Sequence, residues 1–308
     1  MPSFDSALDD TADEQEQYRD ALGFIEGRTP FAAESLPDSD IQVEVNDDLM
    51  HELASHILNR AGHATVIDDA GAGKSLLRDD IYAALRERDD QFRVVRIKEV
   101  EQITTRRFYV RLLEGLRDHD DLDIPAEDDL PRSTDGVRAL VEDVAEQLEE
   151  LGLACIVQVD QMEDVATNTR RFKQLLAGLQ SVGDLGEGEP VFILFLFGTP
   201  TVSERIEDLR RTLDTRLVAK DRSLQRFGYT ETDELVGRWL AWARAEEFSA
   251  SLSADPFTGE AIQAVVDASD GTPRDVRQEC YHAWRAGARQ YADTGETTIT
   301  CQTLEQYR

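Results

Sequence analysis

The chain has 308 residues, a formal net charge of −30 and 41% hydrophobic residues. This length suits one large domain or two smaller ones with a proper core, and the hydrophobic content excludes an intrinsically disordered chain. The longest apolar run, VFILFLF at 191–197, is too short for a membrane span, which needs about 20 apolar residues.

The negative charge comes with a shortage of lysine. The basic residues are nearly all arginine, because the sequence holds just four lysines: Lys74, Lys98, Lys173 and Lys220. We interpret this composition as that of a protein from a cytoplasm of molar salt, where surface carboxylates keep a protein hydrated. An ordinary acidic protein is the alternative. Molar salt shortens the Debye length to about 3 Å, so the charge argues only weakly against nucleic-acid binding.

The cysteines and the N-terminus indicate the compartment. Cys155, Cys280 and Cys301 are scattered and odd in number, as is typical of reduced intracellular thiols. The N-terminus is acidic and polar and does not have the pattern of a signal peptide. We therefore expect a soluble, cytoplasmic protein that does not bind membranes.

The first elements alternate in type. Residues 1–20 are rich in Ser, Asp and Glu, and we expect them to be loose at the start. Helical periodicity runs through 49–62 and stops at a glycine. A strand is predicted at 63–69, followed by a helix at 75–88 that Ser75 opens.

The middle of the chain continues this alternation. Strands are predicted at 92–100, 153–160 and 190–198. Helices are predicted at 104–119, 137–152 and 169–183. The acidic, proline-containing stretch between them, 120–136, predicts a loop of a length that is often functional or disordered. Two of the strands are continuously apolar, as central strands of a parallel sheet are, so we expect a parallel sheet covered by helices on both faces.

After about residue 228 the strand pattern disappears. Three helices are predicted there, at 231–249, 258–269 and 272–290. Three tryptophans at helical spacing, Trp239, Trp242 and Trp284, are expected in the core of this all-α region. We predict an acidic N-terminal extension at 1–44, an α/β domain at 45–227 and a small helical domain at 228–308.

The turn after the first strand, within VIDDAGAGKSLL at 66–77, predicts a phosphate-binding loop. In the pattern G-x-x-x-x-G-K-[ST], backbone N–H groups and a helix N-terminus face the phosphates, Lys74 reaches the outer ones, and the Ser75 hydroxyl binds Mg²⁺. Gly71 and Gly73 allow close approach of the backbone. The predicted nucleotide-binding residues are Asp69, Ala70, Gly71, Ala72, Gly73, Lys74, Ser75 and Leu76.

One position departs from this pattern. Asp68 stands where the first glycine belongs. Aspartate tolerates a left-handed backbone better than most residues, so the loop can still form, but the carboxylate brings a negative charge near the phosphates unless it turns away. A degenerate loop that binds no nucleotide is the alternative.

A second acidic position completes the expected site. A P-loop protein needs an acid at the end of another strand to hold hydrated Mg²⁺, and the strand CIVQVD supplies Asp160. The next residue in many P-loop ATPases is a glutamate that activates water, and here it is Gln161. An amide orients water but is a poor proton acceptor, so we expect slow hydrolysis. Glu163 is nearby, and we expect its side chain to point differently.

Together these features resemble an AAA+ ATPase. FILFLFGTP at 192–200 lies where AAA+ proteins keep sensor 1, which the resemblance assigns to Thr199. LDTRLVAKDRSLQRFGYTETDEL at 213–235 resembles the initiator clade, the archaeal and eukaryotic origin-recognition ATPases, and implies that Arg216 is the arginine finger. DGTPRDVRQECYHAW resembles the lid's sensor 2 and implies Arg274. The closing TTITCQTLEQYR is similar to the element that ends such lids, and Gly-Thr-Pro at sensor 1 is similar to transposition helper ATPases.

The resemblance spans roughly residues 45–308 and implies a P-loop NTPase α/β fold followed by a helical lid. It implies ATP or ADP with Mg²⁺ as ligands, with Ser75 and Asp160 at the metal. The implied catalytic residues are Lys74, Asp160, Gln161, Thr199, Arg216 and Arg274. Arg210 and Arg211 compete for the finger's role, and each arginine can instead be a solvated surface charge.

We therefore expect an ATP-binding AAA+ protein from a salt-loving archaeon or its virus. The resemblance places the end of the sequence at the lid, so we expect no C-terminal winged helix of the kind with which origin-recognition proteins grip DNA. We expect a slow ATPase or ATP-dependent switch in a DNA-associated assembly for replication initiation, transposition or defence. Self-association or a partner protein would use the nucleotide face, and DNA would be reached through a partner. A non-hydrolysing scaffold is the alternative, and a small-molecule kinase is disfavoured.

Overall fold

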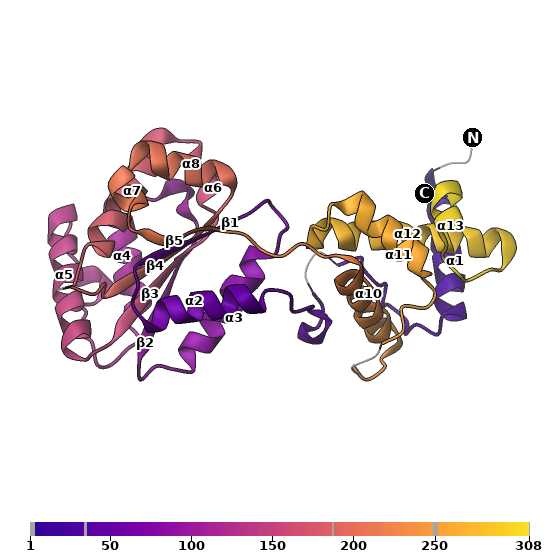
Figure 1. Ribbon diagram of the computed structural model, residues 1–308, viewed down its shortest axis with the longest axis horizontal. Helices are drawn as coiled ribbons and strands as arrows, with labels where there is room; N and C mark the ends of the chain where they lie inside the picture. The colour runs from indigo at the N-terminus through magenta and orange to yellow at the C-terminus, as the bar shows by residue number, and fades with distance from the viewer. Residues whose placement is uncertain (1–3, 34–35, 187, 249–251, 308) are drawn as a thin grey trace. The chain divides into compact units, whose positions relative to one another are not determined.

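The computed structural model describes residues 4–33, 36–186, 188–248 and 252–307, and the chain forms two compact units (Figure 1). The sheet unit consists of Asn46–Leu224. The helical unit consists of Met1–Val45 together with Gln225–Arg308. The sheet unit is therefore inserted, as one continuous segment, between the two segments of the helical unit.

The sheet unit is built on one parallel sheet. Its strands are β1 His63–Ile67, β2 Phe92–Ile97, β3 Ala154–Val159, β4 Phe192–Gly198 and β5 Leu217–Arg222. Their order is β2-β3-β4-β1-β5, with every neighbouring pair parallel. The predicted parallel sheet is thus confirmed, and the two continuously apolar strands, β3 and β4, lie inside it. The sequence analysis missed β5, because this edge strand has polar residues and an exposed Val218 where a central strand is apolar.

Helices cover both faces of the sheet (Figure 1). In β3, Ala154 and Ile156 face a core shared with α2 Asp47–Leu58 and α3 Lys74–Arg86. The alternating residues, among them Val157, pack into a core on the other face. That face is covered by α4 Thr105–Leu116, α5 Thr134–Glu150, α6 Met162–Ala166, α7 Thr169–Gly183 and α8 Pro200–Leu209.

Shorter elements fill the connections of the sheet unit. They are α9 Arg211–Asp214 and two 3-10 helices, Val100–Gln102 and Glu127–Asp129. The second 3-10 helix lies in the stretch 120–136, which was predicted to be a loop. That stretch ends where the Ser133 hydroxyl accepts the N–H of Gly136 at 3.1 Å, which caps the start of α5.

The helical unit contains both ends of the chain. Its helices are α1 Phe4–Ala21, α10 Tyr229–Arg244, α11 Gly259–Ser269, α12 Pro273–Thr294 and α13 Cys301–Tyr307, with a 3-10 helix at Ser39–Ile41. α10 ends earlier than predicted, because Ala245 is left-handed, and the expected last residue, Ser249, lies outside the described residues.

The segment predicted as a loose N-terminal extension is part of this unit's core. Within the described part of 1–20, α1 packs on α12, and the fully buried rings of Tyr18 and Trp284 lie 6.1 Å apart. The Tyr18 hydroxyl donates to the carbonyl of Thr297 at 2.7 Å. One buried aromatic residue in a polar segment leaves no periodic pattern, so composition alone was misleading here.

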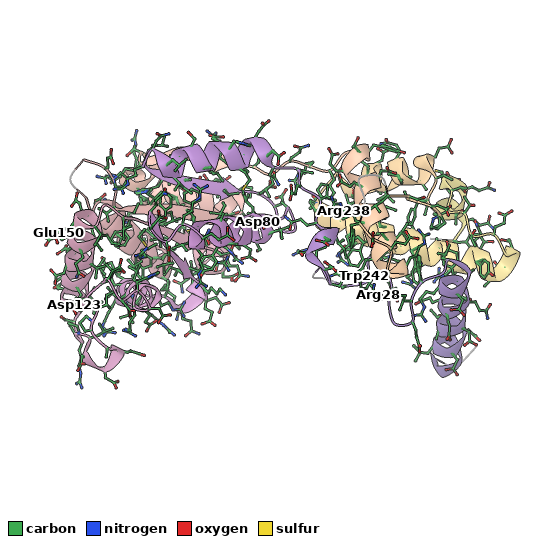
Figure 2. The ribbon with its side chains drawn as sticks, turned by 90° about the horizontal axis from the view of Figure 1, so that it is seen from below. Arg28, Asp80, Asp123, Glu150, Arg238 and Trp242 are labelled. Carbon is green, nitrogen blue, oxygen red and sulfur yellow. The ribbon has the colours of Figure 1, made fainter. Side chains whose placement is uncertain are left out.

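The tryptophans lie as predicted. Trp239 and Trp284 are fully buried, and Trp242 is half-buried against the same core. The guanidinium of Arg28 lies over the Trp242 ring, 5.1 Å from its centroid (Figure 2). This cation–π contact ties the N-terminal segment to α10.

Among the helices of the described residues, we find none whose length and apolar character would allow it to cross a membrane.

A buried histidine opens the first strand. The ring of His63 is almost completely buried, and its Nδ1 accepts the N–H of Leu194 on β4 at 3.3 Å. A ring nitrogen that accepts a hydrogen bond carries no proton, so the folded state holds a neutral imidazole. Burial and then the positive charge of Arg216 lower the pKa of His63 from 6.5 to about 4, against the opposing hydrogen bond to the carbonyl of Gly183.

We expect the free energy of unfolding to decrease as the pH falls from 6.5 to about 4. The unfolded chain takes up the proton near pH 6.5 and the folded ring only near 4, so the contribution of His63 is complete above 6.5 and is lost towards 4. The shift corresponds to about 3 kcal/mol. Urea denaturation at several pH values should show a weaker pH dependence for His63→Gln. The exposed His51→Gln should keep the wild-type slope, and equal slopes for all three would contradict the assignment.

Candidate nucleotide-binding site

Three of the predicted site segments gather at one edge of the sheet. The loop 68–73 follows β1, Asp160 follows β3 and Thr199 follows β4. These three strands are neighbours in the order β3-β4-β1, and all are parallel. Parallel strands end at the same edge, where ligands bind in open α/β sheets, so the topology brings these residues together.

The loop has the backbone of a phosphate cradle. Gly71 and Gly73 are left-handed, with φ of 91° and 102°, a conformation that glycine adopts without strain. Gly73 is the N-cap of α3, and Lys74 is its first residue. The first N–H groups of a helix have no intrahelical acceptor and carry a partial positive charge. Ser75 and Leu76 are exposed beside this helix end.

Asp68 has a structural role that the consensus glycine could not perform. Its carboxylate is buried, and Oδ2 accepts the N–H of Leu224, beyond β5, at 2.9 Å, while Oδ1 accepts the N–H of Asp69 at 2.7 Å. Asp68 is not among the left-handed residues of the chain, so its position does not need the freedom of glycine. The carboxylate therefore fastens the start of the loop to the segment after β5.

Lys74 lies at the centre of the loop. Its Nζ donates to the carbonyls of Asp68 and Asp69, at 2.6 and 2.7 Å, and the side chain is buried. Burial lowers the pKa of Lys74, and nearby carboxylates oppose this, with Glu163 the strongest, followed by Asp68 and Asp160. The ammonium group is thus held among backbone oxygens and negative charges, positioned for an anion at the helix end.

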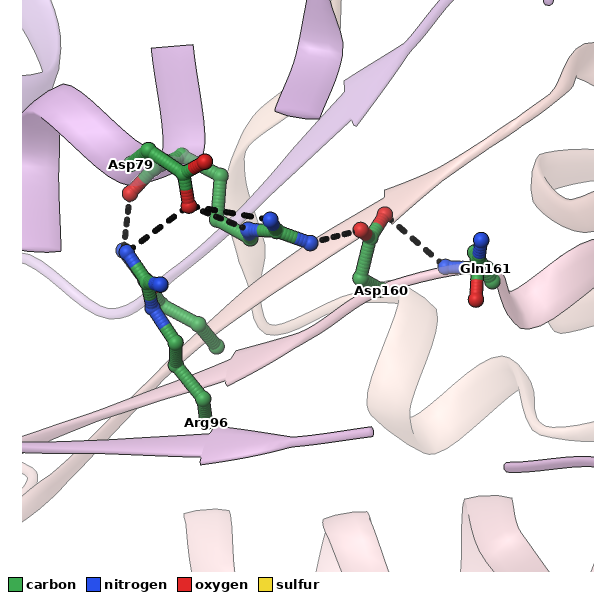
Figure 3. A network of polar contacts seen from close by, with 6 residues as sticks. Asp79, Arg96, Asp160 and Gln161 are labelled. Carbon is green, nitrogen blue, oxygen red and sulfur yellow. Dashed lines mark hydrogen bonds and ion pairs between the residues drawn. The ribbon is translucent and has the colours of Figure 1, made fainter. Parts of the chain in front are cut away.

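Asp160 is paired with an arginine that the sequence analysis did not consider. Arg78, on α3, donates from Nη1 to Oδ2 of Asp160, and the N–H of Gln161 donates to Oδ1 at 2.9 Å (Figure 3). The guanidinium of Arg78 also lies 2.9 Å from Oδ1 of Asp79, which in turn pairs with Arg96 at 2.9 Å. Asp160 is therefore one end of a four-member network of alternating charge.

This pairing bears on the expected Mg²⁺ site at Ser75 and Asp160. A hard cation such as Mg²⁺ binds oxygen ligands and its own waters, whereas here one carboxylate oxygen of Asp160 faces a guanidinium and the other a backbone N–H. Arginine stays protonated in proteins. In the structure as described, the residues around Asp160 do not fit a metal ion at this carboxylate.

The two candidates for water activation differ in placement. Gln161 is exposed and left-handed, with φ of 55°, at the N-cap of α6. Glu163, in the first turn of α6, is half-buried, and its buried Oε2 has no hydrogen-bond partner within the described part of the chain. Among the nearby carboxylates, that of Glu163 exerts the strongest attraction on Lys74.

Thr199 lies at the carboxyl end of β4, next to β1, as the sensor 1 prediction requires. It is half-buried at the N-cap of α8, where its side chain makes no capping hydrogen bond and its carbonyl accepts the N–H of Val202 at 2.8 Å. The Thr199 side chain thus does not cap α8.

Arg216 lies at the opposite edge of the sheet, directly before β5. Its guanidinium pairs with Asp184 and donates to the carbonyl of Gly183 at 3.4 Å, beside His63 at the start of β1. It cannot reach a nucleotide on its own loop, so the predicted finger role requires a second copy of the chain or a partner. The competing residues Arg210 and Arg211 lie on the preceding turn, half-buried and exposed respectively.

Arg274 belongs to the helical unit, exposed in the first turn of α12 after Pro273. The preceding residue Thr272 accepts a hydrogen bond from Arg226 at 3.1 Å, and the left-handed Gly271 accepts the N–H of Phe227 at 2.8 Å. These contacts position the start of α12 within its own unit.

Sequence reasoning missed two participants. Arg78 follows Ser75 by three residues, so helical spacing alone places both on one side of α3. The N–H of Leu224 left no signal, because any residue type supplies a backbone donor to Asp68.

The role of Asp68 can be tested through stability. We expect Asp68→Ala to lower the free energy of unfolding by about 1–3 kcal/mol, because it leaves the buried N–H of Leu224 without its acceptor. Asp68→Gly, which restores the consensus, should lose a similar amount. Chemical denaturation would measure both, with the exposed Asp90→Ala as the matched control. Full stability of the glycine variant would contradict the role assigned to the carboxylate.

Comparison with known proteins places the fold. No protein-family model matches the chain, and neither does any curated protein. The Aeropyrum pernix ORC2 protein in its ADP form is similar with a TM-score of 0.53 and 10% identity, over 90% of this chain and 70% of that one. The Aeropyrum pernix ORC1 protein in complex with DNA is similar with a TM-score of 0.50 and 12% identity, over 89% of this chain and 67% of that one.

A third solved structure agrees. Cdc6p from Pyrobaculum aerophilum gives a TM-score of 0.50 and 14% identity, over 87% of this chain and 67% of that one. Likeness at such low identity concerns the fold alone. The parallel sheet with flanking helices and the helical region have the fold of these three proteins.

Proposed function

We propose that this chain is an ATP-binding AAA+ protein that acts as a slow ATPase or nucleotide-dependent switch in a DNA-associated assembly. The observation that carries this proposal is the buried Lys74 at the centre of a loop whose two left-handed glycines lead into α3. The nucleotide-binding residues are Asp69, Ala70, Gly71, Ala72, Gly73, Lys74, Ser75 and Leu76.

The chemistry of the cradle favours a polyphosphate. A helix N-terminus and glycine N–H groups attract an anion, and Lys74 adds a full positive charge that is now satisfied by two backbone carbonyls. A phosphate oxygen is a stronger acceptor for an ammonium group than a neutral carbonyl, because hydrogen bonds between ions are stronger. Phosphate binding would therefore draw Lys74 from the carbonyls of Asp68 and Asp69.

Structures with the same fold support the class of ligand. The Aeropyrum pernix ORC2 protein was solved in an ADP form and as ADPNP-ADP complexes, and the ORC1 protein of that organism was solved in complex with DNA. By this analogy we assign ATP and ADP as ligands and a DNA-associated assembly as the setting. Thr199 would serve as sensor 1 and Arg274 as sensor 2.

Arg216 supports an assembly rather than a solitary chain. Its position at the far edge of the sheet from the loop suits a finger that acts on a neighbour's nucleotide. A cation beside the γ-phosphate stabilises the charge that develops in phosphoryl transfer. Self-association, or a partner presenting its own loop, would complete the site.

Hydrolysis would depend on Glu163. Gln161 has no proton-accepting group, whereas the carboxylate of Glu163 is close enough to Lys74 to be its strongest attractive charge. One oxygen of this carboxylate is buried and finds no hydrogen-bond partner among the described residues, so it is free to accept a hydrogen bond. A non-hydrolysing scaffold is the second candidate, and it is favoured by Gln161 together with the pairing of Asp160 by Arg78.

Nucleotide binding should require Lys74. We expect Lys74→Ala to weaken ATP and ADP binding by about 10- to 100-fold, the equivalent of one charge-assisted hydrogen bond. Displacement of a fluorescent nucleotide in high-salt buffer would measure the affinities. Lys173→Ala, an exposed lysine on α7, should bind as the wild type does. Equally negligible binding by all three proteins would end the proposal.

The rate of phosphate release from ATP distinguishes a protein that hydrolyses ATP from a non-hydrolysing scaffold. We expect Glu163→Gln to lower the rate at least about tenfold, because a general base contributes about 10²–10⁴-fold, with ATP affinity retained. Asp164→Asn, an exposed neighbour on α6, should keep the wild-type rate. Undetectable release by the wild type despite tight ATP binding would favour the scaffold.

A further inference from the structure

We propose that Arg78 is a built-in counter-ion that takes the place of a divalent cation at Asp160, so that nucleotide binding at this loop does not require Mg²⁺. The inference rests on the proposed nucleotide function and concerns one property of the same site. It follows from the placement of the guanidinium, the way it is held and the charges around it.

The placement is set by the helix that the loop begins. Arg78 lies four residues after Lys74 and three after Ser75 on α3, so its side chain leaves the same side of the helix. From there its guanidinium reaches Oδ2 of Asp160 at the end of β3 (Figure 3). The carboxylate expected to face a hydrated metal ion thus already faces a permanent cation.

Arg78 is held both through its guanidinium and through its backbone carbonyl. Its Nη2 and Nε lie 2.9 and 3.3 Å from Oδ1 of Asp79, and its backbone carbonyl accepts Nε2 of Gln158 at 3.2 Å. Gln158 lies two residues before Asp160 on β3 and accepts Nε of Arg96 at 3.3 Å. The Arg78 and Asp160 side chains are only 13% and 12% exposed. The ion pair of Arg78 and Asp160 is therefore largely buried, unlike the ion pair of an exposed surface arginine.

The supporting arginine is anchored as well. Arg96 on β2 pairs with Asp79 at 2.9 Å, and its guanidinium lies 3.6 Å from the centroid of the Tyr82 ring, on the same helix as Arg78. Two arginines and two carboxylates therefore form a network that is balanced in charge. A metal ion at Asp160 would have to displace a guanidinium that Asp79 also holds.

The charges near the loop explain why a counter-ion is needed there. Glu163, Asp68, Asp160 and Asp69 all act on the ammonium group of Lys74, so an incoming polyphosphate meets several carboxylates. Asp68 is turned towards the N–H of Leu224. Arg78 neutralises the charge of Asp160. In a P-loop protein a bound divalent cation neutralises the acid at this position.

The decisive measurement is the dependence of nucleotide affinity on Mg²⁺. We expect the wild type to bind ADP and a non-hydrolysable ATP analogue with affinities that differ by less than about threefold, or about 0.7 kcal/mol, between Mg²⁺ and a chelator. Arg78→Gln should bind at least about tenfold more weakly in chelator than in Mg²⁺. Arg78→Lys, which keeps the charge, should resemble the wild type.

The matched control is Arg88→Gln, which removes an exposed arginine just after α3 and should leave the wild-type behaviour unchanged. A tenfold loss of wild-type affinity on removal of Mg²⁺ would overturn the proposal, because it would mean that the ion displaces Arg78. This comparison needs no variant, so it stands even if Arg78→Gln does not fold.

A metal-only experiment is independent of nucleotide binding. Titration of nucleotide-free protein with Mn²⁺, followed by electron paramagnetic resonance, should give equal binding for the wild type and Asp160→Asn. Arg78→Gln should bind one more ion than Arg88→Gln. Loss of a wild-type Mn²⁺ site in Asp160→Asn would refute the counter-ion role. Absence of nucleotide binding with the expected Mn²⁺ result would instead remove the proposed function and leave the pairing intact.

Discussion

The parallel alignment of five strands is the constraint on which the candidate site depends. Because β1, β3 and β4 are adjacent and point the same way, segments that follow Ile67, Val159 and Gly198 in the sequence end side by side. The same alignment sends Arg216 to the far edge, where β1 and β5 begin. The direction of the strands thus places Arg78 near the loop and Arg216 at the opposite ends of the strands.

An acid-rich composition changes what the arginines do. The sequence has 63 acidic and 33 basic residues, and several of its guanidinium groups pair with carboxylates. In the sheet unit Arg78 pairs with Asp160, Arg93 with Asp121 and Arg216 with Asp184. The planar, permanently charged guanidinium suits such pairing better than an ammonium group. The lysine at the centre of the loop differs from these, since backbone carbonyls hold it and leave its charge for a ligand.

Most of the sheet unit could be predicted from sequence, and the reasons for the failures are physical. The apolar runs of β3 and β4 and the glycine–lysine turn were recognisable because they are local patterns. Strand β5 was missed because an edge strand tolerates polar residues, and the segment 1–45 because its few buried rings lack periodicity. The contacts of Asp68 and Arg78 join residues 156 and 82 positions apart, and no local pattern encodes such partners.

The connection between the units has a consequence for the order of folding. The sheet unit is a continuous segment, whereas the helical unit needs both the first 45 residues and the last part of the chain. During synthesis the sheet unit is complete while the partners of Tyr18 and Phe31, on α10 and α12, have yet to be made. Since domains fold as units as they are made, residues 1–45 would be translated before the sheet unit and would find their place after it.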